Sequence, residues 1–327
     1  MRLAPLTTLR LGGPAGRLIE AHSEDDLVQA VRDGADLVLA GGSNVVIADD
    51  GVPGTVVLVR TRGVVHHDGL TIVAAGEPWD ELVERTVADG LQGFECLSGI
   101  PGSTGATPIQ NVGAYGQDVS ETVEWVRVYD RETDEVVTMP AAECGFDYRT
   151  SVFKHRDRWT VLAVAFRLRE STSSGPLRYA ELARTLGVPV GGTAPLEDVR
   201  AAVLGLRRGK GMVIDPADPD SVSAGSFFTN PILTHEAWAK LPNAPAFPEP
   251  DGRIKTSAAW LIEQAGFHRG YGNGRIGISA KHTLALVNRG EGTTAELMAL
   301  AREIVGGVEA RFGVTLRPEP VFVGLSL

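Results

Sequence analysis

Residues 97–118 read LSGIPGSTGATPIQNVGAYGQD, and we expect the rest of the chain to be arranged around this segment, which we call the organising loop. Its five glycines and two prolines are too frequent for the interior of a helix or strand. Small hydroxyl and amide side chains lie between them, so backbone N–H groups can approach a flat or anionic ligand. An ordinary tight surface loop is the alternative, because glycine and proline occur in loops of every kind. The length of the stretch and its apolar residues favour a functional loop.

Length, composition and net charge limit the classes of protein to which the chain can belong. With 327 residues and 43% apolar composition, the chain can bury a large core in two or three units. A net charge of −10 argues against a general nucleic-acid-binding surface. The sequence shows neither an apolar run of the roughly 18 residues needed to cross a bilayer nor a secretory signal, so we expect a cytoplasmic protein without a membrane partner. Cys96 and Cys144 are too few for a disulfide framework and lack metal-ligand spacing, so no metal site is expected.

The residues before the organising loop predict a strand, a glycine turn and a second strand. A capping box at Ser23 begins a helix that ends near Gly34, and the short strands 37–40 and 45–47 flank the turn Gly41–Asn44. A Rossmann phosphate loop requires a helix after the turn, so this is a different fold. The turn could hold a phosphate on its N–H groups, or it could be a simple β-turn, and the residues alone leave both open.

The remaining elements mix strands and helices without βαβ alternation, which indicates an α+β fold. We expect further strands at 55–59, 71–74, 159–168 and 283–287, a hairpin at 123–139, and two terminal strands around 317–320. We expect helices at 78–89, 179–186, 196–206, 257–264 (capped by Thr256) and 293–312, with a linker at 171–176.

An anionic substrate would need basic residues gathered at one site, because the chain is acidic overall. Most single charges are solvated surface residues, so each candidate has a low prior on its own. The candidates are Arg149, Lys154, Arg207, Arg208, Lys210, Arg253, Lys255 and Lys281.

Six motifs in order resemble the UDP-N-acetylenolpyruvoylglucosamine reductase family over nearly the whole chain. They are Gly41–Asn44 (GGSN), Ser98–Gly102 (SGIPG), Pro108–Gly116 (PIQNVGAYG), Tyr148-Arg149, Gly225–Pro231 (GSFFTNP) and Pro318–Pro320 (PEP). The resemblance implies an FAD-binding domain of the vanillyl-alcohol-oxidase (PCMH) type at 1–170, with two α+β subdomains at about 1–62 and 63–170. It also implies a segment at 171–210 that carries a tyrosine loop, as in the longer form of the family, and a C-terminal α+β substrate domain at 211–327, whose last residues return to the active site.

The implied activity is the NADPH-dependent reduction of the enolpyruvyl ether of UDP-N-acetylglucosamine-enolpyruvate to UDP-N-acetylmuramate, a step of peptidoglycan biosynthesis. The implied cofactor is non-covalently bound FAD, and the protein is expected to act as a monomer. The resemblance assigns the flavin contacts to Gly41, Gly42, Ser43, Asn44, Ser98, Gly99, Gly102, Gly105, Ala106, Thr107, Gln110, Asn111, Gly113, Ala114 and Tyr115.

Three residues are implied as catalytic. Hydride addition to C3 pushes charge onto C2 and its carboxylate, which Arg149 can hold through two parallel bonds. Ser226 would give the proton to C2, where positioning matters more than acidity. Glu319 would help only if it keeps its proton, or if it orients Arg149 or a water, because a bare carboxylate opposes an enolate. The implied substrate contacts are Tyr148, Tyr179, Lys210, Asn230 and His282.

Other interpretations stay open at this point. Arg149 could form a surface ion pair, Ser226 could cap a turn, and Glu319 could be a solvated edge residue. A related flavin oxidase acting on an alcohol or hydroxy acid is the second candidate, although no His or Cys lies in a glycine context that suggests covalent flavin attachment. His66-His67 comes nearest, beside a predicted turn. A catalytically silent nucleotide-binding module is the third.

Overall fold

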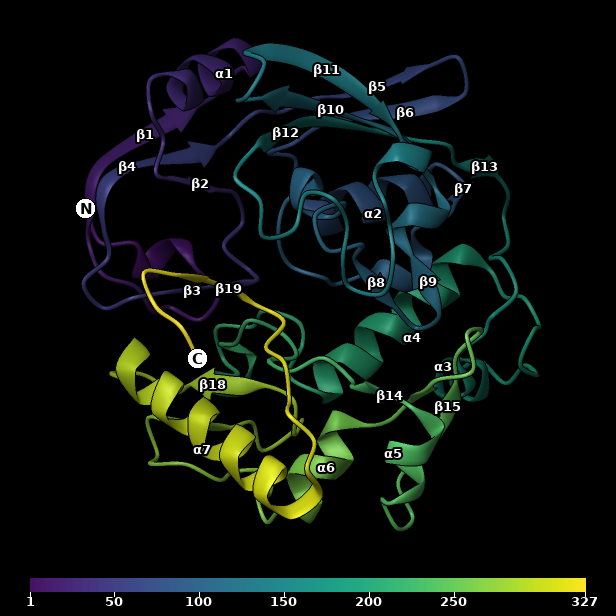
Figure 1. Ribbon diagram of the computed structural model, residues 1–327. Helices are drawn as coiled ribbons and strands as arrows, with labels where there is room; N and C mark the ends of the chain where they lie inside the picture. Colours follow the sequence, from purple (N-terminus) through teal and green to yellow (C-terminus); the bar gives the residue numbers. More distant parts are fainter. The chain divides into compact units, whose positions relative to one another are not determined.

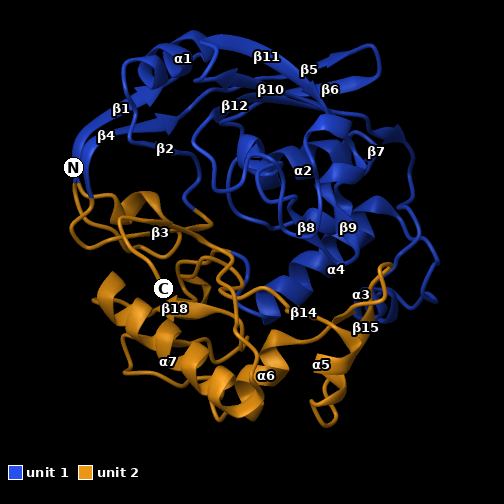
Figure 2. Ribbon diagram, viewed as in Figure 1, with its two compact units in different colours: residues 1, 15–42, 52–213 blue, residues 2–14, 43–51, 214–327 orange.

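The computed structural model describes residues 1–327, which divide into two compact units (Figure 2). Unit 1 comprises residue 1 and residues 15–42 and 52–213, and unit 2 comprises residues 2–14, 43–51 and 214–327. The chain therefore passes from one unit to the other within the glycine turn, since Gly42 ends a segment of unit 1 and Ser43 begins a segment of unit 2.

Unit 1 begins with a small parallel sheet in the order β1-β4-β2 (Figure 1). Its strands are β1 (Ala15–Ala21), β2 (Leu37–Leu39) and β4 (Val52–Val59), and α1 (Glu24–Arg32) connects β1 to β2. The predicted capping box is present, because Ser23 Oγ accepts from the Asp26 N–H and the Asp26 carboxylate accepts from the Ser23 N–H. Gly34 has a φ of 102°, which explains the glycine beyond the helix end.

A five-stranded antiparallel sheet in the order β11-β10-β12-β6-β5 is the largest sheet of unit 1. Its strands are β5 (Val64–His67), β6 (Leu70–Ala74), β10 (Val123–Asp130), β11 (Glu135–Pro140) and β12 (Trp159–Phe166). The predicted 123–139 hairpin is confirmed. The exposed His66 and His67 end β5, and the turn predicted beside them is Asp68-Gly69, both with positive φ.

Helix α2 (Trp79–Ala88) packs its apolar face into the core of unit 1. The rings of Trp79 and Phe94 lie 4.8 Å apart, and the Phe94 ring meets Phe166 of β12 edge-on at 4.9 Å. All three side chains are fully buried. Buried aromatic side chains stabilise a core strongly, so this packing fixes α2, from which the chain leads into the organising loop.

The remaining elements of unit 1 lie against the C-terminal part of the organising loop, near Tyr115 and Gly116. Strand β7 (Leu91–Gln92) pairs with β13 (Arg169–Glu170), and the helices α3 (Ala180–Thr185) and α4 (Leu196–Gly209) follow. Cys96 packs with apolar residues of both helices, so the prediction that it is a packed core residue is confirmed. The serine-rich segment 171–176 is tied to the unit by the bond from the Ser171 N–H to the Gly90 oxygen.

Unit 2 has its own core around α6 (Ala258–Gln264) and the long helix α7 (Thr294–Phe312). Thr293 begins α7 with a capping box, and Gly313 ends it in the left-handed conformation. Strand β3 (Val45–Ile47) pairs in parallel with β19 (Val321–Val323), which joins the start of the chain to its end. The other elements are β14 (Ile232–Leu233), α5 (His235–Ala239), β15 (Phe247–Pro248), β16 (Ile254–Lys255), β17 (Ile276–Ile278) and β18 (Leu286–Asn288).

Three local predictions in unit 2 are wrong in detail. Ser257 caps α6 instead of Thr256, whose hydroxyl donates to the Pro245 oxygen. The strand predicted at 283–287 is β18, three residues later, because its register is set by pairing with β17. The only strand beside Arg317–Pro320 is β19, which follows it; before it the chain is held by the buried side chains Val314 and Leu316 and by one bridge from Pro318 to Phe228.

Candidate active site

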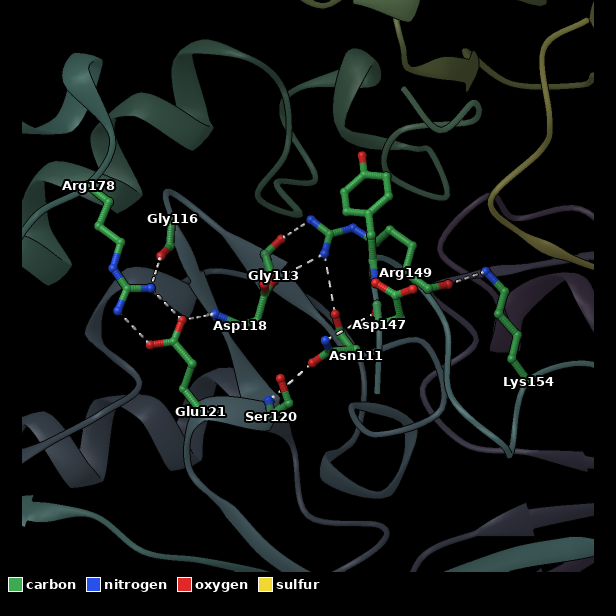
Figure 3. Close-up of polar contacts among 11 residues, drawn as sticks. Asn111, Gly113, Gly116, Asp118, Ser120, Glu121, Asp147, Arg149, Lys154 and Arg178 are labelled. Atoms are coloured by element: carbon green, nitrogen blue, oxygen red, sulfur yellow. Dashed lines mark hydrogen bonds and ion pairs between the residues drawn. The ribbon is translucent and has the colours of Figure 1, made fainter. Parts of the chain in front are cut away.

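Arg149 lies at the centre of a polar cluster in unit 1, on the bend 145–154 between β11 and β12 (Figure 3). Its Nη2 donates to the Gly113 oxygen at 2.5 Å, and its Nη1 donates at 3.3 Å to both the Asn111 oxygen and the Asp118 carboxylate. The neighbouring Tyr148 ring lies 5.2 Å below the guanidinium carbon. Two backbone carbonyls of the organising loop therefore orient the guanidinium.

The backbone around this cluster adopts conformations that non-glycine residues avoid. Asn111 and Arg149 have φ values of 46° and 54°. The Asn111 side chain supports both segments, because its Nδ2 donates to the Asp147 oxygen at 3.2 Å and its Oδ1 accepts from the Ser120 N–H at 3.1 Å. Uncommon backbone conformations that the surroundings hold in place are concentrated at functional sites.

The tip of the organising loop is a short hairpin of β8 (Gly113–Ala114) and β9 (Gln117–Asp118). Tyr115 and Gly116 form its turn, and both have positive φ. The Tyr115 ring meets the Tyr179 ring edge-on at 5.3 Å, and Lys210 Nζ lies 5.6 Å from the Tyr115 ring centre. Unit 1 thus brings together Tyr115 with two of the predicted substrate contacts.

The pKa values of both Tyr115 and Lys210 are raised at this hairpin. Burial raises the pKa of the Tyr115 phenol, so the ring stays neutral. Burial alone would lower the pKa of Lys210, but its hydrogen bond to Glu181 at 2.6 Å, together with the attraction of Glu181 and the neighbouring tyrosines, outweighs burial and the net pKa is raised. Lys210 is therefore a full positive charge at neutral pH.

Helix α2 anchors the first half of the organising loop. Trp79 Nε1 donates to the Leu97 oxygen at 3.1 Å, and the Trp79 N–H donates to the Gly102 oxygen at 3.0 Å. The Asp80 carboxylate accepts from the Gly99 N–H at 2.6 Å. Ser98 is fully buried, and its hydroxyl donates to the Glu95 oxygen, which makes it a support of the loop backbone.

The glycines of this loop allow backbones to pack directly on one another. A Cβ on Gly41 would lie 2.5 Å from Gly102 Cα, and a Cβ on Gly105 would lie 2.5 Å from the Ala75 Cβ. The two predicted flavin-binding segments therefore touch within unit 1. Ala106 and Thr107 continue the same turn, in which the Thr107 hydroxyl donates to the Thr104 oxygen.

Unit 2 gathers a second group of predicted site residues. The Glu319 N–H donates to the Phe227 oxygen at 2.9 Å, directly after Ser226, and Asn44 Nδ2 reaches the Glu319 oxygen at 3.5 Å. The half-buried Ser226 follows Gly225, whose φ is 74°. Residues from three distant parts of the chain thus meet through hydrogen bonds to the backbone of Glu319.

Two further predicted contacts in unit 2 have local structural roles. The Asn230 side-chain oxygen accepts from the Ala258 N–H at 3.0 Å at the start of α6. The backbone of His282 closes a turn through bonds with Ser279 and Ala285.

Sequence reasoning missed the acidic residues that hold these groups. Asp118 contacts Arg149, Glu181 contacts Lys210, and Asp80 holds Gly99. Asp118 is the last residue of the organising loop, and this position is the one feature of the sequence that draws attention to it. Nothing in the local sequence connects it to an arginine 31 positions further on.

These residues fit a flat dinucleotide cofactor. The two glycine-rich segments pack without side-chain bulk between them, and small polar side chains line them, which suits a ligand held largely by the backbone. Residues 15–139 match the FAD binding domain family, and residues 216–323 match UDP-N-acetylenolpyruvoylglucosamine reductase, C-terminal domain. The fold and site therefore define an FAD-binding oxidoreductase, and the predicted α+β architecture with a flavin domain is confirmed.

Full-length similarity then gives the family. A UDP-N-acetylenolpyruvoylglucosamine reductase of Salinispora arenicola is 58% identical, covering 99% of this chain and 95% of the relative. That of Thermobifida fusca is 56% identical, covering 99% and 97%. The crystal structure of the Thermus caldophilus enzyme has a TM-score of 0.70 at 25% identity, covering 99% and 97%. The chain belongs to the UDP-N-acetylenolpyruvoylglucosamine reductase family, which acts in peptidoglycan biosynthesis.

No helix of the structure is long and apolar enough to cross a membrane. No group of three or more His, Cys, Asp or Glu side chains is arranged to hold a metal ion.

Proposed function

We propose that this protein uses NADPH to reduce the enolpyruvyl ether of UDP-N-acetylglucosamine-enolpyruvate to UDP-N-acetylmuramate. The observation that carries the proposal is the Arg149 guanidinium, oriented by the Gly113 and Asn111 carbonyls within the glycine-rich loop. A bound flavin, which the organising loop would hold, would supply the redox chemistry, namely the relay of a hydride from NADPH to C3 of the enolpyruvyl group.

Arg149 binds the substrate carboxylate in this proposal. Hydride addition at C3 leaves negative charge on C2 and on the carboxylate oxygens, and a guanidinium already fixed in space stabilises that charge without reorganising. Its plane matches a carboxylate through two parallel N–H bonds, which lysine cannot provide.

Ser226 donates its hydroxyl proton to C2, which completes the addition across the double bond. The turn around it is held by the Phe227 N–H, which donates to the Leu284 oxygen at 2.7 Å. A serine hydroxyl is a weak acid, so its contribution depends on this fixed position beside a strongly basic carbon.

Glu319 keeps its proton or orients a water, so that it adds a hydrogen-bond donor and no second negative charge. Its backbone bond to Phe227 supports a role beside Ser226. Lys210 and Tyr179, which gather around Tyr115, bind the diphosphate of the sugar nucleotide. We also infer a cytoplasmic location, because both cysteines are free, as in a reducing compartment.

The test separates the two half-reactions by anaerobic stopped-flow absorbance. NADPH should bleach the yellow enzyme, and the enolpyruvyl sugar nucleotide should restore the colour. In Ser226→Ala, bleaching should be unchanged and reoxidation should slow by roughly 10²- to 10⁴-fold, the usual worth of a positioned proton donor.

The matched control is Ser223→Ala, which removes the hydroxyl that accepts from the Gly225 N–H at 3.2 Å but leaves Ser226 in place. Its reoxidation should stay within a few-fold of wild type. Equal slowing of both half-reactions in Ser226→Ala would mean that the serine only supports the turn. Bleaching by an alcohol or hydroxy acid instead of NADPH would contradict the proposed function.

A further inference from the structure

Asp118 is the acidic partner of Arg149 in unit 1. Its Oδ1 lies 3.3 Å from Arg149 Nη1, with the Asp118 side chain 47% exposed and the Arg149 side chain 20% exposed (Figure 3). An ion pair this exposed contributes little to stability by itself. The pair nevertheless belongs to the organising loop, because Asp118 is the last residue of that loop and Arg149 donates to its backbone.

Three acceptors define the plane of the guanidinium. The Gly113 and Asn111 oxygens accept from Nη2 and Nη1, and the Asp118 carboxylate also accepts from Nη1. Asp118 is the one charged acceptor of the three, so it adds an electrostatic restraint to the two carbonyl bonds, of which the Gly113 bond is the shorter at 2.5 Å.

In the β8–β9 hairpin, the Asp118 carboxylate occupies the space where a side chain at position 113 would lie. Gly113 and Asp118 are paired across β8 and β9, and a Cβ on Gly113 would lie 1.6 Å from Asp118 Oδ1 and 2.8 Å from Arg149 Nη1. Glycine at position 113 is thus a requirement for the carboxylate to reach the guanidinium.

The ion pair between Arg178 and Glu121 supports the backbone of Asp118. The Asp118 N–H donates to Glu121 Oε1 at 3.2 Å, and Arg178 donates to both carboxylate oxygens of Glu121 at 2.9 and 3.1 Å. Arg178 also donates to the Gly116 oxygen at 3.2 Å at the hairpin tip. Asp118 is therefore fixed at its backbone before any substrate binds.

We propose that Asp118 is a positioning residue for Arg149, which keeps the guanidinium in the orientation that receives the substrate carboxylate. This inference rests on the proposed function of Arg149. A guanidinium restrained in advance loses less freedom when the carboxylate binds, and it is already in place when charge develops. Asp118 itself touches neither the substrate nor the reacting atoms in this scheme.

The experiment compares Asp118→Ala and Asp118→Asn by the two-stage stopped-flow measurement. In Asp118→Ala, bleaching by NADPH and the bound-flavin spectrum should match wild type, while reoxidation should slow by roughly 10- to 100-fold, the usual effect of losing a hydrogen bond to a charged group. Asp118→Asn keeps an acceptor oxygen of the same reach, so its reoxidation should slow by only a few-fold.

A double-mutant cycle with Arg149→Ala tests whether Asp118 acts through the arginine. If it does, Arg149→Ala combined with Asp118→Ala should be no slower than Arg149→Ala alone. The matched control is Glu124→Ala, which removes a carboxylate of similar exposure, 42%, from its ion pair with Arg167 in the same unit and should leave both half-reactions unchanged.

The outcomes separate the inference from the function on which it rests. Additive slowing in the double variant, or wild-type reoxidation in Asp118→Ala when Arg149→Ala is slow, would overturn the inference alone. If wild-type enzyme is not reoxidised by the enolpyruvyl sugar nucleotide, or if Arg149→Ala behaves as wild type, the proposed function fails and the inference falls with it. Should Asp118→Ala lose its flavin, Asp118→Asn carries the same cycle at smaller amplitude.

Discussion

The ammonium group of Lys210 lies 2.6 Å from the carboxylate of Glu181, and both side chains are about one-third exposed, at 31%. The pair stands beside Tyr115 and Tyr179, where a diphosphate is proposed to bind. A carboxylate at this position competes with phosphate for the same cation. The substrate must therefore displace Glu181 or share Lys210 with it.

Glu181→Gln should strengthen the binding of the sugar nucleotide. Removing the competing charge leaves Lys210 to the diphosphate, so KM for the enolpyruvyl substrate should fall by roughly two- to fivefold, the scale of a partly exposed ion pair. Steady-state kinetics at several salt concentrations measures this, with Glu236→Gln as a control that removes the exposed partner of Lys240. An unchanged KM would show that Glu181 does not compete.

Gly113→Ala should disable the enzyme without unfolding it. The added methyl meets Asp118 Oδ1 at 1.6 Å, so the carboxylate must leave Arg149. We expect reoxidation of the reduced flavin to slow at least as much as in Asp118→Ala. Gly205→Ala is the control, because it lies inside α4 with nothing within 4 Å and should stabilise the helix by about 1 kcal/mol.

Gly41→Ala should weaken flavin binding. Its Cβ would lie 2.5 Å from Gly102 Cα, so the two glycine-rich segments must separate. The purified variant should contain less flavin per protein, measured by the visible absorbance of the purified protein. Gly306→Ala in α7 of unit 2 has open space and should retain full occupancy; a yellow Gly41→Ala with wild-type occupancy would contradict the prediction.

The two cysteines should be unreactive in the folded protein at about pH 8, because the thiolate is the reactive form. Burial raises the pKa of both the Cys96 and the Cys144 thiol to about 12. An unfolded thiol ionises near pH 8.5, so the unfolded state releases protons first and the free energy of unfolding falls as pH rises from about 8.5 towards 12. A chromogenic disulfide reagent should titrate almost no thiol in the native protein and both after denaturation. Rapid labelling of either cysteine in the folded protein would contradict the prediction.

Much of the local structure could be predicted from the sequence, because caps and turns depend on neighbouring residues. Ser23 and Thr293 begin their helices with capping boxes, and Gly34 and Gly313 end them with positive φ. The β18 register and the missing strand before Arg317 could not be predicted, because pairing with a distant strand decides them. For the candidate site, the glycine loop and Arg149 stand out in the sequence, whereas Asp118 and Glu181 do not.

The α+β class, the flavin loop and the family could all be predicted from the amino-acid sequence, because residue types at turns and motifs in a fixed order carry that information locally. The folded structure was needed to establish that β3 pairs with β19, that Asn44 reaches Glu319 across 275 positions, and that Asp118 contacts Arg149. The physical reason is that such contacts depend on how strands and loops far apart in the chain pack together. No local pattern records that packing.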